Sequence, residues 1–230
     1  MKADPQTDGR EVELKFLLAA EADWRRLGLL LAQLAPAQVM AQRNLYLDTP
    51  DLLLDALGVM VRIRLHEQRA VATCKAGSRL VDGLMTTGEW EAELPPPQAR
   101  LWRHEPPAEV PLAALPIAAA VRAVLGDPGA NPGLVVRASL DNSRQRFDLS
   151  GLHPNAPPLL GCGSLVPFEL DRACAAPDHL RYELEVEHAQ AGLLREPIGR
   201  FLTDNGIGWR QATETKYAWL LRCCAQTAGR

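Results

Sequence analysis

Charged residues recur at every second position in several short segments of this sequence. In residues 11–16, Glu11, Glu13 and Lys15 alternate with apolar residues, so a β-strand would present the three charges on one face and the apolar side chains on the other. The same alternation predicts strands in residues 61–65, 73–75, 89–94, 144–146, 169–171 and 183–187. These segments therefore place ionic groups on one side of a sheet.

The charges are also sorted by sign. Arg62 and Arg64 share one face, whereas Glu183, Glu185 and Glu187 form a row of carboxylates. For any single strand, a solvated charged face is the ordinary interpretation. Two unit charges about 4 Å apart, however, repel by roughly 4 kcal/mol at an effective dielectric near 20. Rows of like charge in several strands therefore indicate that something of opposite charge binds there.

A sheet that closes on itself would use both faces of these strands. Amphipathic helices would cover the apolar faces from outside, and the charged rows would line an enclosed polar bore. Clustered carboxylates suit hard divalent cations, while guanidinium groups bind phosphate in a bidentate fashion. We therefore expect a mainly β (α+β) fold: a closed antiparallel β-barrel with helices packed outside, which binds a metal–phosphate substrate.

Length and composition are those of a single globular domain. Of the 230 residues, 47% are hydrophobic and 23% charged, so we expect one domain over residues 1–230 with its core at residues 10–220. The net charge of -3 argues against a nucleic-acid partner. Because residues 1–10 are polar and no apolar run approaches roughly 18 residues, we expect no membrane partner and a cytoplasmic location. A homodimer is compatible with these features.

Cysteine and histidine offer no recognisable chemistry. The histidines are scattered without the spacing of metal ligands, and the cysteines lack a Cys-x-x-Cys pair, so we interpret the cysteines as reduced and structural. They are Cys74, Cys162, Cys174, Cys223 and Cys224. The candidates for chemistry are therefore the carboxylates, lysines and arginines.

Helical spacing of apolar residues predicts helices over residues 21–34, 116–125, 191–205 and 213–224, with Pro197 interrupting the third. Stretches rich in Pro and Gly predict loops at residues 95–97, 106–111, 127–133 and 154–163. These helices are the elements that would cover the apolar faces of the sheet.

The run Glu11-x-Glu13-x-Lys15 resembles the ExExK signature of the CYTH superfamily, the triphosphate tunnel metalloenzymes. Its companions follow in the same order as in that family, over residues 10–220. They are Tyr46, Asp48 and Thr49, then Leu54, Gly58, Arg62 and Arg64, then Thr73 and Lys75, Glu89 and Glu91, Arg144 and Arg146, Glu169 and Asp171, and Glu183 and Glu185.

This resemblance implies an eight-stranded antiparallel tunnel that holds divalent metal ions, Mg²⁺ or Mn²⁺, and a triphosphate. The implied metal ligands are Glu11, Glu13, Asp171, Glu183 and Glu185. The implied phosphate-binding residues are Lys15, Arg62, Arg64, Lys75, Arg144 and Arg146. Four further residues would line the tunnel in roles that the resemblance does not define: Glu89, Glu91, Glu169 and Lys216. Arg137 is left out, because its parity differs from that of Arg144 and Arg146.

The activity that we expect is hydrolysis of the terminal phosphoanhydride of a triphosphate, with inorganic tripolyphosphate as substrate. The residues that we take as catalytic are Glu11, Glu13, Lys15, Arg62 and Lys75. Metal ions and arginines would neutralise and align the phosphate chain. The sequence lacks the glycine-rich P-loop pattern, so a backbone phosphate cradle of that kind is not expected.

Other functions remain open at this stage. Thiamine triphosphatases and class IV adenylate cyclases share the tunnel, but the His-Phe pair that precedes ExExK in some bacterial cyclases is replaced here by Asp8-Gly9-Arg10. The pattern is closer to bacterial inorganic triphosphatases, which often precede a helical CHAD domain, although no CHAD-like segment follows within these 230 residues. A polyphosphate- or nucleotide-binding module without turnover is an alternative from another class.

Overall fold

The structure, a computed structural model, describes residues 9–150, 165–176 and 179–228. Its strands are β1 (Gly9–Leu18), β2 (Gln38–Asp48), β3 (Val59–His66), β4 (Arg69–Val81), β5 (Leu84–Glu93), β6 (Val110–Pro111), β7 (Gly133–Ser150), β8 (Leu165–Ala176), β9 (His179–Glu187) and β10 (Trp209–Gln211). Its helices are α1 (Glu21–Ala32), α2 (Leu53–Ala56), α3 (Pro96–His104), α4 (Ala118–Leu125), α5 (Ala191–Asp204) and α6 (Lys216–Ala228), with a 3-10 turn at Leu112–Ala114.

The strands follow the hydrogen-bonded order β10-β1-β5-β4-β3-β2-β7-β8-β9, and β1 also pairs with β9. Because of this second pairing, the eight long strands, β1 to β5 and β7 to β9, form a closed antiparallel barrel. The short strands β6 and β10 are additions to it. This confirms the fold that the alternating charges predict.

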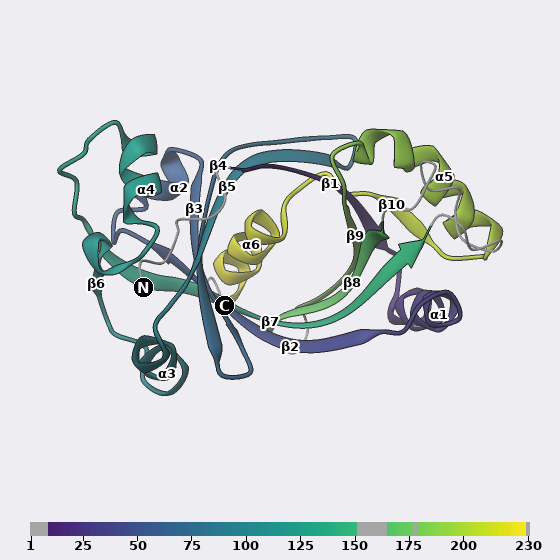
Figure 1. Cartoon of the computed structure of the whole chain (residues 1–230), viewed down its shortest axis with the longest axis horizontal. Helices are drawn as coiled ribbons and strands as arrows, with labels where there is room; N and C mark the ends of the chain where they lie inside the picture. The colour runs from purple at the N-terminus through teal and green to yellow at the C-terminus, as the bar shows by residue number, and fades with distance from the viewer. Residues whose placement is uncertain (1–8, 151–164, 177–178, 229–230) are drawn as a thin grey trace. The chain divides into compact units, whose positions relative to one another are not determined.

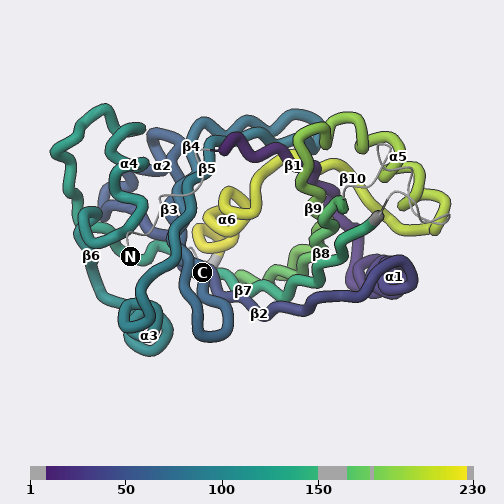
Figure 2. The backbone as a smooth tube through the Cα atoms, in the orientation of Figure 1, coloured from purple at the N-terminus to yellow at the C-terminus, as the bar shows by residue number. Residues whose placement is uncertain are grey.

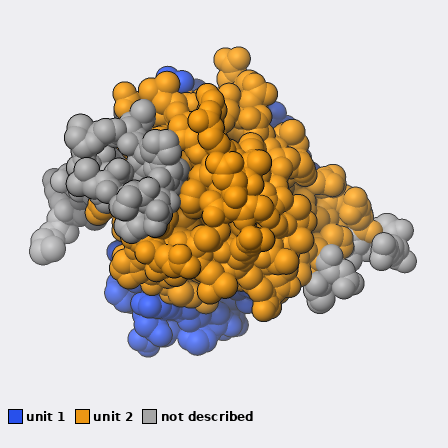
Figure 3. Space-filling view, turned by 90° about the vertical axis from the view of Figure 1, so that its right-hand side faces the viewer, with its two compact units in different colours: residues 1–10, 42–78, 87–141 blue, residues 11–41, 79–86, 142–230 orange. Residues whose placement is uncertain are grey.

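Contacts within the chain divide it into two compact units, coloured separately in Figure 3. Unit 1 comprises residues 1–10, 42–78 and 87–141, and unit 2 comprises residues 11–41, 79–86 and 142–230. Each unit has an apolar cluster of its own. The expectation of one domain over residues 1–230 stays a prediction.

In unit 1, strand β3 shows how the period-two pattern builds the core. Val59, Val61, Ile63 and Leu65 are buried, and the residues between them are half-buried, as the alternation in the sequence predicts. Helices α2, α3 and α4 cover this apolar face with a set of buried side chains: Leu54, Ala99, Trp102, Ala118 and Val121. The opposite face carries Arg62 and Arg64.

In unit 2, the apolar faces of β1, β8 and β9 are covered by α1 and α5 (Figure 1). Leu27 and Leu31 of α1 are fully buried in the same cluster as Phe168 of β8 and Leu184 of β9. The terminal helix α6 differs, because it lies against the opposite, charged face of β8 (Figure 2). Unit 2 therefore has helices on both faces of this part of the sheet.

Two expectations about proline need correction. The sequence Pro95-Pro96-Pro97 was predicted to be a loop, but Pro96 begins helix α3, because proline at the first helical position loses no hydrogen bond and has a suitable φ. Pro197 lies inside a continuous α5 instead of interrupting it. The loop predicted at residues 154–163 and Cys162 lie outside the described residues, whereas Cys74, Cys174 and Cys224 have free thiols.

A tight turn fixes the backbone beside Lys15. Asp82 and Gly83, between β4 and β5, both adopt positive φ, 49° and 74°. The Gly83 carbonyl accepts a hydrogen bond from the Lys15 N–H at 2.8 Å, and a Cβ atom on Gly83 would lie 2.9 Å from the Lys15 carbonyl oxygen. Glycine is therefore required for this close approach.

Among the helices in the described ranges, none combines the length and hydropathy that a membrane span requires.

Strand β8 offers a direct test of the core of unit 2. Phe168→Ala should lower the free energy of unfolding by about 3–5 kcal/mol, because this ring is fully buried. Leu165→Ala on the same strand should have a much smaller effect, because Leu165 is 61% exposed. Urea unfolding followed by circular dichroism measures both, and equal losses would contradict this assignment of the buried face.

Candidate functional site

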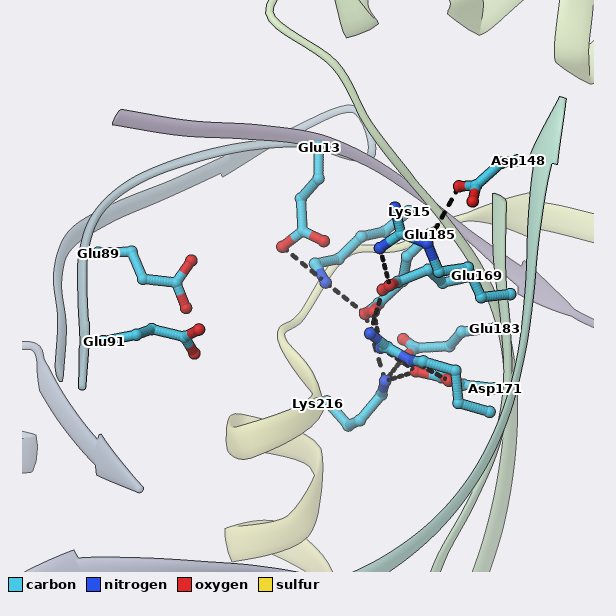
Figure 4. A network of polar contacts seen from close by, with 12 residues as sticks. Glu13, Lys15, Glu89, Glu91, Asp148, Glu169, Asp171, Glu183, Glu185 and Lys216 are labelled. Carbon is cyan, nitrogen blue, oxygen red and sulfur yellow. Dashed lines mark hydrogen bonds and ion pairs between the residues drawn. The ribbon is translucent and has the colours of Figure 1, made fainter. Parts of the chain in front are cut away.

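Four strands and one helix bring a cluster of ionic side chains together in unit 2. Antiparallel register places Lys15 of β1 opposite Glu185 of β9, and it places Asp171 of β8 opposite Glu183 of β9. Directly opposed residues share one face of the sheet and lie within side-chain reach. Strand β7 adds Arg144. Helix α6 adds Lys216 (Figure 4). We call these residues, with Glu13, Glu169 and Arg181, the carboxylate cluster.

Lys15 joins the carboxylates of β1 and β9. Its Nζ lies 2.5 Å from Glu185 Oε1 and 2.9 Å from Glu13 Oε1. All three side chains are at least nine-tenths buried. Two of the three charges of ExExK, Glu13 and Lys15, therefore meet within one network, as their shared strand face predicts.

Arg144 binds the carboxylates of β8 and β9 with several of its N–H groups. Its Nε donates to Asp171 Oδ1 at 2.8 Å, and its Nη2 donates to Asp171 Oδ2 and Glu185 Oε2, each at 2.7 Å. Its Nη1 donates to Glu169. The pairing with Asp171 is the bidentate geometry that makes guanidinium–carboxylate contacts strong and directional.

Lys216 reaches the cluster from α6, the helix on the charged face. Its Nζ lies 2.5 Å from Asp171 Oδ2, 3.1 Å from Glu183 Oε2 and 3.2 Å from Glu185 Oε1 (Figure 4). One ammonium group thus contacts three buried carboxylates. The sequence could place Lys216 on a helix but could not indicate which side chains it meets.

Arg181 belongs to the cluster, although we did not predict it. Its Nε donates to Glu183 Oε1 at 2.7 Å, and its Nη2 donates to the backbone carbonyl of Glu214 at 2.9 Å. Its guanidinium carbon also lies 5.6 Å from the centre of the Trp219 ring. The parity of β9 could have revealed Arg181, because it lies two residues before Glu183 and so on the same face.

Mutual pairing keeps these buried groups charged. Burial would raise the pKa of Asp171, but Arg144 and Lys216 outweigh it and lower this pKa to about 2. Burial likewise opposes the charge on Glu185, yet Lys15, Lys216 and Arg144 hold its pKa well below the usual value. For Lys15, burial favours the neutral amine, but Glu13 and Glu185 raise its pKa well above the usual value. Asp171, Glu185 and Lys15 are therefore charged at neutral pH.

Unit 1 holds a second set of charges, on β3, β4 and β5. Glu91 Oε1 accepts a hydrogen bond from Thr73 Oγ1 at 2.7 Å and lies 3.5 Å from Arg62 Nη2. Burial would raise the pKa of Glu91, but Arg64 and Arg62 lower it. Thr73 is fully buried and was not predicted as a site residue, although it flanks Lys75 in the quoted motif.

Lys75 completes this set, with its Nζ 3.2 Å from Glu89 Oε1. We call Arg62, Arg64, Thr73, Lys75, Glu89 and Glu91 the cationic cluster, because its three basic side chains outnumber its two carboxylates. Each of these side chains is buried or half-buried. Basic groups in partial burial can bind a polyanion more strongly than solvated ones.

Two predicted residues lie at the margin of the carboxylate cluster. Arg146 is paired with Asp148 at 3.0 Å and lies 3.5 Å from Glu169. Glu11 is half-buried, two residues before Glu13 on β1. The remaining predicted residues fall within the two clusters, and the roles assigned to all of them stay predictions.

The donor chemistry of the carboxylate cluster suits a hard divalent cation, because it offers buried carboxylate oxygens. The present arrangement of side chains leaves no place for such a cation, because these oxygens are occupied by Lys15, Arg144, Arg181 and Lys216. Within residues 9–150, 165–176 and 179–228, no group of three or more Asp, Glu, His or Cys side chains is arranged to hold a metal ion. A metal ion would require at least one of these cations to move.

Comparison with known proteins places the chain in a family. The family described as CYTH domain matches residues 9–204, and the chain belongs to this family. No curated protein matches the chain.

Solved structures share its fold. One is HpAC1 from Hippeastrum, a candidate adenylyl cyclase described as having a dominant triphosphatase activity (TM-score 0.75, 21% identity, covering 92% of this chain and 95% of that chain). Another is a candidate adenylate cyclase from Bacillus halodurans (TM-score 0.58, 22% identity, covering 90% and 96%). A third is a protein from Pyrococcus horikoshii (TM-score 0.52, 13% identity, covering 91% and 97%).

Acid should remove part of the stability that the carboxylate cluster provides. The pKa of Asp171 is lowered from 3.8 to about 2 on folding, so its contribution is present above about pH 4 and is lost as the pH falls through about 2. This shift corresponds to about 2 kcal/mol. The free energy of unfolding of Asp171→Asn should therefore be lower than that of the wild type at pH 7. The difference between the two proteins should be about 2 kcal/mol smaller at pH 2. Urea unfolding at several pH values measures it, and a deficit independent of pH would contradict the expectation.

Proposed function

We propose that this protein is a metal-dependent triphosphatase that hydrolyses the terminal phosphoanhydride of inorganic tripolyphosphate. The observation that carries the proposal is the carboxylate cluster, in which buried acidic and basic groups are held together by direct contacts. Membership of the CYTH family supports it. The triphosphatase activity described for HpAC1, which shares the fold, points in the same direction.

The basic residues would bind the phosphate oxygens. In the cationic cluster, Arg62, Arg64 and Lys75 present more positive charge than Glu89 and Glu91 neutralise. In the carboxylate cluster, Arg144 is already aligned by Asp171 and Glu185, so a phosphate would meet a guanidinium group of fixed orientation. Lys15 and Arg146 would add further contacts.

The carboxylates would provide the metal ligands, in a set formed by Glu11, Glu13, Asp171, Glu183 and Glu185. A bound divalent cation, Mg²⁺ or Mn²⁺, would supply charge neutralisation on the phosphates and would lower the pKa of a water molecule. In the structure, basic side chains contact the oxygens of Asp171, Glu183 and Glu185. The set of metal ligands and the identity of the metal are therefore parts of the proposal.

The reaction transfers the terminal phosphoryl group to water. The water oxygen forms a bond to the terminal phosphorus, the bridging P–O bond breaks, and pyrophosphate and orthophosphate leave. The fixed basic side chains would hold the phosphate chain in line and would neutralise charge that develops on the leaving oxygen. Positioning and electrostatics would therefore account for most of the catalysis.

Adenylate cyclase activity is the second candidate, because two of the structural neighbours carry that name. A cyclase would form cyclic AMP and pyrophosphate from ATP and would release no orthophosphate. A module that binds polyphosphate without turnover would release neither orthophosphate nor cyclic AMP.

The cytoplasmic location, the homodimer and the lack of a nucleic-acid partner also stay predictions.

An assay of product formation separates these functions. The purified protein is incubated with Mg²⁺ or Mn²⁺ and with tripolyphosphate, ATP or thiamine triphosphate, and orthophosphate and cyclic AMP are measured together. Orthophosphate release that is highest with tripolyphosphate and ceases with EDTA is expected. Cyclic AMP from ATP as the main product would overturn the proposal.

Arg62→Ala should raise KM for tripolyphosphate about tenfold or more, because it removes a guanidinium contact to phosphate. Arg69→Ala is the matched control. Arg69 lies on the adjoining strand β4 of the same unit, but it is exposed and pairs with the exposed Glu93. An unchanged KM in the Arg62 variant, or equal effects of both variants, would contradict the assignment.

Glu13→Gln should lower kcat at least a hundredfold, because it removes a buried carboxylate of the proposed metal-binding set. The exposed Glu196→Gln on α5 serves as the control and should keep the wild-type rate. Initial rates at saturating tripolyphosphate and several Mn²⁺ concentrations measure both. Normal turnover by the Glu13 variant would remove this residue from the site.

A further inference from the structure

Every carboxylate oxygen of Asp171, Glu183 and Glu185 already contacts a cationic side chain. Arg144 binds both oxygens of Asp171 and one of Glu185, while Lys15 binds the other oxygen of Glu185. Arg181 binds Glu183 Oε1. Lys216 is the cation among these that contacts all three carboxylates. The carboxylates are thus arranged around its ammonium group (Figure 4).

The contact between Lys216 and Glu183 lacks a hydrogen bond. Glu183 Oε2 is buried and lies 3.1 Å from Lys216 Nζ, but within the described residues it accepts no hydrogen bond. A buried carboxylate oxygen without a hydrogen bond is costly, so this atom would gain from a closer cation. A divalent metal ion approaches carboxylate oxygens to about 2.0–2.6 Å. This is closer than the 3.1 Å between Glu183 Oε2 and Lys216 Nζ.

Lys216 is also the cation that can leave most easily. Lys15, Arg144 and Arg181 lie on strands β1, β7 and β9, whereas Lys216 lies on helix α6. Its side chain is 14% exposed, more than those of the three strand cations. The lysine side chain has several rotatable bonds, so its ammonium group can swing away without movement of the sheet.

We infer that Asp171, Glu183 and Glu185 form a single cation position that Lys216 fills in this structure, and that a divalent metal ion and the Lys216 ammonium exclude each other there. The inference rests on the proposed function only for the choice of a divalent metal as the competing cation.

Helix α6 has a second attachment, so the exchange requires only the Lys216 side chain to move. Arg181 donates to the backbone carbonyl of Glu214, just before α6, and its guanidinium group lies over the Trp219 ring. Neither contact involves Lys216. Arg181 would therefore keep the helix in place while the cation position changes its occupant.

The test is a titration of Mn²⁺ alone into the metal-free full-length protein, without substrate, by isothermal titration calorimetry. Lys216→Met should bind Mn²⁺ at least tenfold more tightly than the wild type, because the competing ammonium is gone. Arg200→Met is the control for the loss of one positive charge, since Arg200 is exposed and pairs with Glu196 on α5. It should match the wild type.

Equal or weaker Mn²⁺ binding by the Lys216 variant, or no binding by any of the three proteins, would overturn the inference. A second measurement uses the unmodified chain, so it does not depend on the folding of a variant. Acetylation of lysines is followed by mass spectrometry with and without Mn²⁺ at constant ionic strength. Mn²⁺ should accelerate the modification of Lys216 severalfold, and an unchanged rate would contradict the exchange.

Failure of the exchange can be distinguished from failure of the proposed function. If the wild type hydrolyses tripolyphosphate but the Lys216 variant binds Mn²⁺ no more tightly, the exchange is wrong and the function stands. If the variant binds Mn²⁺ at least tenfold more tightly but the wild type releases no orthophosphate, the exchange stands and the function is wrong.

Discussion

The pairing of buried carboxylates with buried cations is the interaction on which the rest of the structure depends. Asp171, Glu183 and Glu185 lie on two neighbouring strands, where their mutual repulsion and the loss of hydration would oppose folding. Lys15 and Arg144, from other strands, and Lys216, from α6, offset both costs. The closed strand order makes this possible, because β1 pairs with β9.

The same pairing explains why helices lie on both faces of the sheet in unit 2. Helix α1 contributes Leu27 and Leu31 to an apolar cluster, as an amphipathic helix on a sheet usually does. Helix α6 instead contributes Lys216 to an ionic one. Arg181 connects the ionic cluster to the terminal helix, because it binds Glu183 and also the backbone carbonyl of Glu214, just before α6. The site and the terminal helix are therefore parts of one arrangement.

Much of the barrel could be predicted from the sequence, because period-two alternation is a local property: Val61 and Ile63 are buried and Arg62 and Arg64 are not. Helix α3 was missed because Pro95–Pro97 also suits a loop. The partners of Lys216 could not be predicted, since they depend on where α6 packs after the sheet has formed. The division into two units was likewise invisible, because the segments of each unit are far apart in the sequence.

The most direct test of the account is a crystal structure with Mn²⁺ and tripolyphosphate bound, in which anomalous scattering locates the metal. The account predicts an Mn²⁺ peak bounded by Asp171, Glu183 and Glu185, with phosphate oxygens within hydrogen-bonding distance of Arg144 and Lys15. Binding of both the metal and the triphosphate at an outer surface, with this ionic cluster unchanged, would contradict it.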